Sequence, residues 1–291
     1  MTSRTLLQRL PLHAVLVALI LLWSVPTIAL LVSSFREPTA ISSSGWWHAA
    51  GEDLTLRNYR TVLAQQGLAR SLLNSVLISV PATLLLVFVS ALAAYAFAWM
   101  RFPGRTPLFF LVVALLVVPL QVTLIPVLRL LGALTVPGPV PLLGGNWFGV
   151  SSYAGIWLAH VAYGLPFGIF LLRNFFASLP RDLIEAAQLD GASEWLIFAR
   201  IVLPLSGSAL AALGIFQFLW VWNDLLIALV FLGDPDLAPL PLRITNLVSS
   251  YGSSYQVLTA AAFISMAIPL VVFFAFQRYF VRGILAGATK G

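Results

Sequence analysis

The sequence has 291 residues, of which 60% are hydrophobic and only 9% are charged. Soluble proteins usually carry about 25% charged residues, so this composition excludes an ordinary water-soluble domain and indicates a membrane protein. The net charge of +6 comes mostly from arginines scattered singly along the chain, which form no patch for nucleic acid. There is no cysteine, which excludes disulfides, thiolate catalysis and cysteine-ligated metals.

Six apolar runs follow one another along the chain, and each reaches the ~20 residues that cross a bilayer as a helix. They are residues 12–32, 72–99, 108–128, 153–172, 205–232 and 257–276. Four prolines within three of these runs, Pro81, Pro119, Pro126 and Pro166, are expected to kink the helix or to lie near its end. The sequence therefore predicts an all-α membrane protein, with residues 1–291 forming one transmembrane domain of six helices.

The distribution of basic residues predicts the orientation. With the N-terminus inside, the inner segments hold ten of the sixteen lysines and arginines and the outer segments hold six. Basic residues are enriched in cytoplasmic loops, so both termini are expected in the cytoplasm.

Residues 178–204, between the fourth and fifth runs, differ from every other connection. Ser178 and Pro180 resemble a helix start, and Asp182 suits the positive end of the helix dipole. Gly191 is placed to end this first helix or to turn the chain. We therefore expect a short cytoplasmic helix that ends in a turn.

A second helix is expected after this turn. Ser193 can cap its start, and Pro204 is expected to close it at the membrane entry. Small side chains at Ala186, Ala187 and Ala192 would allow another protein to approach closely. By period and charge alone, the segment fits either an ordinary connecting helix or a docking site.

The spacing favours docking. Glu185-Ala186-Ala187, then Gly191, then Ile201-x-Leu203-Pro204 resembles the EAA loop of binding-protein-dependent ABC import permeases. In that family the loop forms a coupling helix that sits in a groove of a cytoplasmic ATPase. The resemblance implies that Glu185 contacts or orients the ATPase and that Gly191 makes the turn. The coupling residues that it implies are Glu185, Ala186, Ala187, Asp190, Gly191, Ile201, Leu203 and Pro204.

Motifs elsewhere extend the resemblance over nearly the whole chain. They include Asn58-Tyr59, Asn74-Ser75, 93–97, 102–105, 216–224 and 282–291. These segments are similar to the sugar-importer branch typified by the smaller subunit of the maltose permease, and residues 216–224 are most like permeases for α-glucosides. The tail has Thr289 where relatives commonly carry valine.

Polar side chains inside the predicted spans are candidates for a translocation path. Aromatic faces and amides suit neutral sugars, but the same residues also serve as contacts between helices. The candidates are Gln121, Gln217, Trp220, Trp222, Asn223 and Asp224. Asp224 is an intramembrane carboxylate, which marks a functional site by default, although a structural role has at least equal weight. His160 is interpreted as a packing residue rather than a proton relay.

No catalytic or metal site is expected in this chain. Its one lysine is Lys290, so it lacks a phosphate-binding loop, and its three histidines make a metal site improbable. The resemblance implies that ATP and Mg²⁺ bind to a separate ATPase dimer. The other implied partners are a second homologous permease, an extracytoplasmic solute-binding protein and membrane lipid, in a bacterial or archaeal inner membrane.

Two alternatives remain. The cargo could instead be a glycerol-phosphate ester or another polyol. The chain could also be a secondary transporter acting alone, which would predict paired polar or discontinuous helices in two halves.

Overall fold

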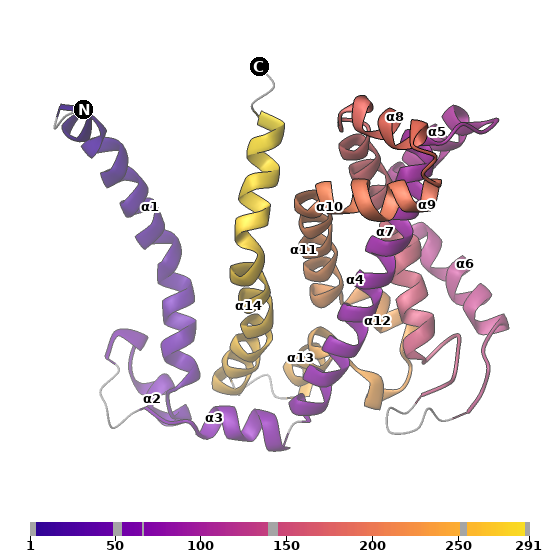
Figure 1. Ribbon diagram of the computed structural model, residues 1–291. Coiled ribbons are helices and arrows are strands. Elements are labelled where there is room, and N and C mark those ends of the chain that lie inside the picture. Colours follow the sequence, from indigo (N-terminus) through magenta and orange to yellow (C-terminus); the bar gives the residue numbers. More distant parts are fainter. Residues whose placement is uncertain (1–3, 49–53, 66, 139–144, 251–254, 289–291) are drawn as a thin grey trace. The chain divides into compact units, whose positions relative to one another are not determined.

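The computed structural model describes residues 4–48, 54–65, 67–138, 145–250 and 255–288, and these are almost entirely helical (Figure 1). The only extended pairing in these ranges is two isolated β-bridges. The chain divides into two compact units, residues 1–69 with 244–266 and residues 70–243 with 267–291. The prediction of an all-α membrane fold is confirmed.

The first unit contains a long exposed helix followed by short helical segments. The elements are α1 (Arg4–Ser34), α2 (Pro38–Ser43), η1 (Trp46–His48), α3 (Arg57–Arg60) and η3 (Thr61–Gln65). α1 includes a candidate membrane span over Leu10–Ser34, and none of the most apolar window of this span is buried. Where α1 ends, the amide of Asn58 donates to the carbonyl oxygens of Ser34 and Arg36, both at 2.9 Å. These bonds tie α3 to the end of α1.

The second unit holds most of the remaining helices. They are α4 (Leu68–Trp99), α5 (Arg105–Ala114), η4 (Leu115–Val117), α6 (Leu120–Ala133), α7 (Tyr153–Phe176), α8 (Arg181–Leu189), α9 (Glu194–Ile197), η5 (Phe198–Val202), α10 (Leu203–Leu205), α11 (Gly207–Asn223), α12 (Leu226–Phe231) and η6 (Pro235–Leu237). α13 (Leu240–Ser250) and α14 (Tyr255–Ala288) contribute residues to both units.

Four of the six predicted spans are long apolar helices, and the other two are bent pairs. The expected third span is two helices, 105–117 and 120–133, that meet at 105°. Pro119 lies between them in an extended conformation, because proline cannot continue the backbone hydrogen bonds of η4. The expected kink at Pro119 is present, and it divides the predicted run 108–128 between two helices.

The expected fifth span is also interrupted. Residues 194–205 and 207–223 form helices that meet at 76°, with the break at Ser206. α11 then ends at Asn223, and α12 begins separately at Leu226. The predicted run 205–232 is therefore divided between helices, and Pro204 lies one residue before the first of these segments ends at Leu205.

Glycines on α7 let the helices of the second unit approach closely. A Cβ on Gly164 would lie 2.3 Å from Cδ1 of Leu86 on α4 and 2.7 Å from the amide oxygen of Gln217 on α11. A Cβ on Gly168 would lie 2.3 Å from the hydroxyl of Ser90 on α4. Small residues at such positions are typical of helix contacts in membranes. This packing fixes α4, against which the 178–204 loop is folded.

Candidate functional site

The 178–204 loop folds as two short helices joined by a tight turn. α8 ends in a Schellman motif: the N–H groups of Gly191 and Ala192 donate to the carbonyl oxygens of Gln188 and Ala187 at 3.1 and 3.0 Å. Gly191 has φ +78°, which a residue with a Cβ adopts only with strain. The hydroxyl of Ser193 accepts the N–H of Leu196 and caps α9, as expected.

α8 begins at Arg181, close to the helix start that Ser178 and Pro180 predicted. Ser178 does not cap it, because its hydroxyl donates to the carbonyl oxygen of Phe175 at 2.7 Å. Pro180 is the residue before the first helical position, and Asp182 lies in the first turn as expected.

The two ends of the expected coupling set have different surroundings. Glu185, Ala186, Asp190 and Gly191 are exposed on α8 and its turn, and Ala187 is half-buried. Ile201 and Leu203 instead pack against the buried cluster that contains Ile197 and Val202, while Pro204 is exposed. Glu185 and Ala186 are therefore available to a partner, whereas Ile201 and Leu203 anchor the loop.

An exposed apolar surface accompanies the Glu-Ala-Ala segment. Leu183 is 46% exposed, Leu189 89% and Trp195 61%. Ile184, on the other side of α8, is 2% exposed and belongs to the buried cluster. Large apolar side chains grouped on a polar loop are typical of a protein-binding surface.

A hydrogen bond that the sequence did not predict ties this loop to α4. The hydroxyl of Tyr95 donates to the carboxylate of Glu194 at 2.5 Å, and its ring contacts that of Phe198 with centroids 5.2 Å apart. The start of α9 is thus fixed to the end of a long span.

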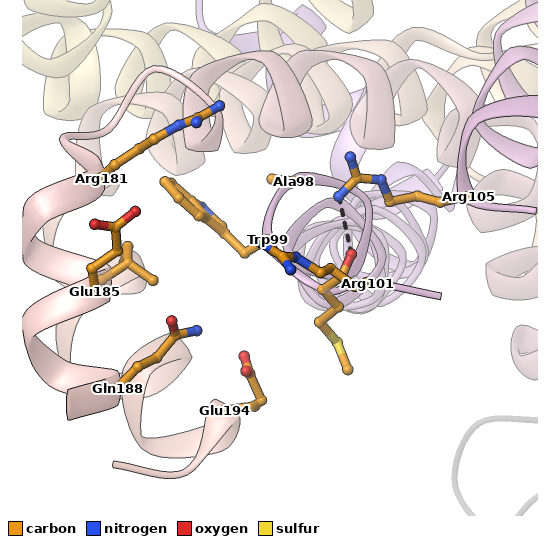
Figure 2. A pocket seen from close by; sticks show the side chains of 10 residues that line it. Ala98, Trp99, Arg101, Arg105, Arg181, Glu185, Gln188 and Glu194 are labelled. Atoms are coloured by element: carbon orange, nitrogen blue, oxygen red, sulfur yellow. Dashed lines mark hydrogen bonds between the residues drawn. The ribbon is translucent and has the colours of Figure 1, made fainter. Parts of the chain in front are cut away.

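A pocket of about 620 Å³ lies between α8 and the turn from α4 to α5 (Figure 2). We call it the α8 pocket. Its polar lining is Arg101, Arg105, Arg181, Glu185, Gln188 and Glu194. Figure 2 shows Arg181, Glu185 and Gln188 on one wall and Trp99, Arg101 and Arg105 on the other. Glu185 therefore borders both the exposed loop surface and a basic pocket.

The candidate path residues do not form one site. Gln217 and Trp220 line a pocket of about 390 Å³ together with Phe167 and Phe216. Gln217 is 2% exposed, and its amide nitrogen has no hydrogen-bond partner among the described residues. These aromatic and amide groups fit a neutral polar solute with apolar faces.

The other four candidate path residues lie outside this pocket. Gln121 is exposed on α6, and Trp222 is 1% exposed in the packed interior. The amide of Asn223 donates to the carbonyl oxygen of Leu219 at 2.8 Å. The carboxylate of Asp224 accepts the N–H groups of Ile227 and Ala228 at 2.9 and 3.3 Å, so it caps α12.

His160 is 3% exposed, in the packed interior of α7. The described residues contain no group of three or more His, Cys, Asp or Glu side chains that could hold a metal ion.

At the opposite end of α4 from Tyr95, a second network holds the 236–240 segment. The amide of Asn74 donates to the carbonyl oxygens of Asp236 and Ala238 at 2.8 and 3.1 Å, and accepts the hydroxyl of Tyr153 at 2.8 Å. Ser75 accepts the N–H of Leu240 at 2.8 Å. Asn74 and Ser75 stood out in the sequence only as part of a family motif, and these partners lie too far along the chain for spacing to predict them.

Comparison with known proteins finds one matching family and several similar permeases. A profile described as "Binding-protein-dependent transport system inner membrane component" matches residues 86–286. The osmoprotective compounds uptake permease protein GgtD of Synechocystis sp. is 50% identical over 97% of this chain and 93% of its own length. The alpha-glucoside transport system permease protein AglG of Rhizobium meliloti is 53% identical over 81% of this chain, which spans 60% of that relative.

A solved structure shares the fold. The crystal structure of a bacterial ABC transporter involved in the import of the acidic polysaccharide alginate includes a chain that matches with a TM-score of 0.76. The match covers 96% of this chain and 99% of that one at 22% identity.

Proposed function

Because this chain belongs to the family of inner membrane components of binding-protein-dependent transport systems, we propose that it is the permease subunit of an ATP-driven importer of α-glucosides or related glucose-containing sugars. The family makes it a multi-pass inner membrane protein and a transport subunit rather than an enzyme. The observation that carries the proposal is the exposed Glu-Ala-Ala segment of the 178–204 loop, fixed by its Schellman turn beside α4.

In this role the loop receives mechanical work from an ATPase. The exposed side chains of Glu185, Leu183 and Leu189 would enter a groove of the partner, while Gly191 sets the direction of the chain. Movement of α8 would reach the spans through the buried anchors of the loop and through the bond from Tyr95 to Glu194. ATP and Mg²⁺ would be bound and used on that partner.

The assembly would contain a second homologous permease, an ATPase dimer and an external solute-binding protein, with both termini of this chain in the cytoplasm. The family description supports the binding protein, because it names transport as binding-protein-dependent. A second solved structure, with a TM-score of 0.67, is of an alginate transporter in complex with a periplasmic protein that carries an alginate pentasaccharide. This supports docking of a loaded binding protein on the outer side.

The cargo proposal rests on chemistry and on relatives. The pocket at Gln217 and Trp220 carries no charged side chain, which suits a neutral sugar better than a phosphate ester. The identity of 53% to AglG supports α-glucosides. A second candidate cargo class is osmoprotective compounds, because GgtD matches 97% of this chain.

The test is uptake by the complete complex in proteoliposomes, with ATP inside and loaded binding protein outside. Glu185→Lys should abolish sugar uptake and reduce co-purification of the ATPase, because it reverses the charge at the docking surface. Gly207→Ala is the control, since a Cβ there would meet nothing within 4 Å.

Two outcomes would contradict parts of the proposal. If Glu185→Lys retains the ATPase and imports sugar at the wild-type rate, the 178–204 loop does not couple. If ATP hydrolysis by the wild-type complex responds to a glycerol-phosphate ester and ignores both α-glucosides and osmoprotective compounds, the cargo is wrong.

A further inference from the structure

The α8 pocket carries an excess of positive charge, and the proposed docking of α8 on an ATPase does not involve its arginines. Three guanidinium groups, those of Arg101, Arg105 and Arg181, line it against two carboxylates. One of these, Glu194, already accepts a hydrogen bond from Tyr95 on α4, so Glu185 is the second carboxylate that faces the three guanidinium groups. The electrostatic balance of the pocket therefore favours an anion.

The α8 pocket lies at the ends of two candidate membrane spans, which is the level of the bilayer surface. Trp99 is the last residue of one candidate membrane span, and Arg105 is the first residue of the next. Both residues line the pocket, which therefore lies where two spans leave the hydrocarbon region. Tryptophan and arginine at span ends are typical of the headgroup layer.

A second hollow continues from the first. It measures about 430 Å³ and shares Arg101 and Arg105 with the α8 pocket, and its other lining residues are Phe102, Gly104, Thr106 and Pro107. The two arginines thus separate a polar pocket beside α8 from a hollow beside the start of a span. This arrangement suits a molecule with a charged head and an apolar body better than a free anion.

Ring contacts and a hydrogen bond hold the turn that carries Arg101 and Arg105 in place. The ring of Phe97 contacts those of Phe102 and Phe109 with centroids 5.9 and 5.6 Å apart, and the guanidinium of Arg173 lies 4.8 Å from the centroid of Phe109. Arg105 donates to the carbonyl oxygen of Met100 at 3.0 Å (Figure 2). Backbone N–H groups at the start of α5 add positive potential, because no side chain caps it.

We propose that the α8 pocket binds the phosphate headgroup of an anionic phospholipid and that this lipid regulates coupling. Basic pockets between spans on the cytoplasmic side are suited to such headgroups. The bound phosphate would bridge Arg181 on α8 to Arg101 and Arg105 on the α4–α5 turn, which holds α8 in its place. The regulatory part rests on the proposed function, since it requires that α8 couples to an ATPase.

The experiment uses the complete complex in nanodiscs of phosphatidylcholine alone or of an equal mixture with phosphatidylglycerol. Lipids retained by the complex are measured by native mass spectrometry, and ATP hydrolysis is measured with loaded binding protein. The variants are Arg101→Gln and the double variant Arg101→Gln with Arg105→Gln. The control is Arg200→Gln, which removes an exposed charge from the same loop but outside the pocket.

The wild type and Arg200→Gln should retain phosphatidylglycerol in preference to phosphatidylcholine. Retention should fall about fivefold for each pocket arginine removed. Phosphatidylglycerol should raise stimulated ATP hydrolysis in the wild type and the control, and much less in the double variant.

Equal phosphatidylglycerol retention by all variants would overturn the proposal, provided each co-purifies with its partner subunits. Displacement of the lipid by inorganic phosphate at equal concentration would identify a free-anion site instead. Loss of retention with no change in ATP hydrolysis would remove the regulatory part. The proposed function is tested separately. If the wild-type complex hydrolyses ATP in response to loaded binding protein in phosphatidylcholine alone, the proposed function stands whatever the lipid result.

Discussion

Asp224 accepts two backbone hydrogen bonds where α11 has ended and α12 begins, which gives an intramembrane carboxylate a structural task. The N–H groups at a helix start have no partner within the helix, and leaving them unbonded is costly away from water. The preference for a structural role over a path role at this position therefore has a physical basis.

Replacing Asp224 with alanine should lower the free energy of unfolding by about 1 kcal/mol, because the cap of α12 is lost. Thermal unfolding of the complex in detergent measures this change. Asp224→Ser keeps an oxygen that can accept these bonds but removes the charge, and it should retain both stability and transport. A serine variant that is stable but imports nothing would show that the charge itself acts on the cargo.

Residues of the candidate site were predictable where their hydrogen-bond partners lie within a few positions along the chain. The turn at Gly191 and the cap at Ser193 depend on neighbours within a few positions, and both are observed. The bond from Tyr95 to Glu194 joins residues 99 positions apart, so no spacing rule identifies it. The hydroxyl of Ser178 bonds backward to the carbonyl oxygen of Phe175, an alternative open to any serine near a helix end, so the sequence did not predict its partner.

Among the elements, α7 is the one whose glycines set how closely its neighbours pack. Gly168 faces Ser90 of α4 so closely that a Cβ has no room, whereas a Cβ on Gly214 of α11 would meet only a methyl group of Val87 at 4.0 Å. The two positions therefore form a matched pair within one packed unit.

Gly168→Ala should destabilise the complex by about 1–3 kcal/mol, because α4 and α7 must separate to admit the methyl group. Gly214→Ala should be neutral or slightly stabilising, since alanine is the better helix former and the space is available. Melting temperatures of the two variants, measured side by side in one detergent, check this. Equal melting temperatures would mean that α4 and α7 are not in close contact.

Helix bends were less predictable than helix positions. Runs of apolar residues identify where a helix can form, and proline at position 119 identifies where one must be interrupted. The angle of 105° depends on what the two halves pack against, which is a property of the folded unit. The break at Ser206 has no proline of its own, and its 76° bend had no signal beyond nearby Pro204.

For the whole molecule, orientation in the membrane can be tested directly because the sequence contains no cysteine. Single cysteines at Leu189 and Asp236, both exposed, provide probes of the two sides. A membrane-impermeant thiol reagent should label Asp236→Cys from outside and Leu189→Cys only after the membrane is opened.

Assembly with the ATPase should then protect Leu189→Cys, because the exposed side chain enters the partner's groove, and should leave Asp236→Cys reactive. Labelling of Leu189→Cys from outside in sealed cells would reverse the orientation and remove the 178–204 loop from the cytoplasm.

α4 is held near both ends: Asn74 and Ser75 bind the 236–240 segment, and Tyr95 binds Glu194. At 1.5 Å per residue these anchor points are about 30 Å apart, the thickness of the hydrocarbon core. Because α4 joins these anchor points as one helix, we expect a displacement of the 236–240 segment to reach the start of α9. Under the proposed function, α4 would therefore connect the outer face to the 178–204 loop directly, without contact with the cargo.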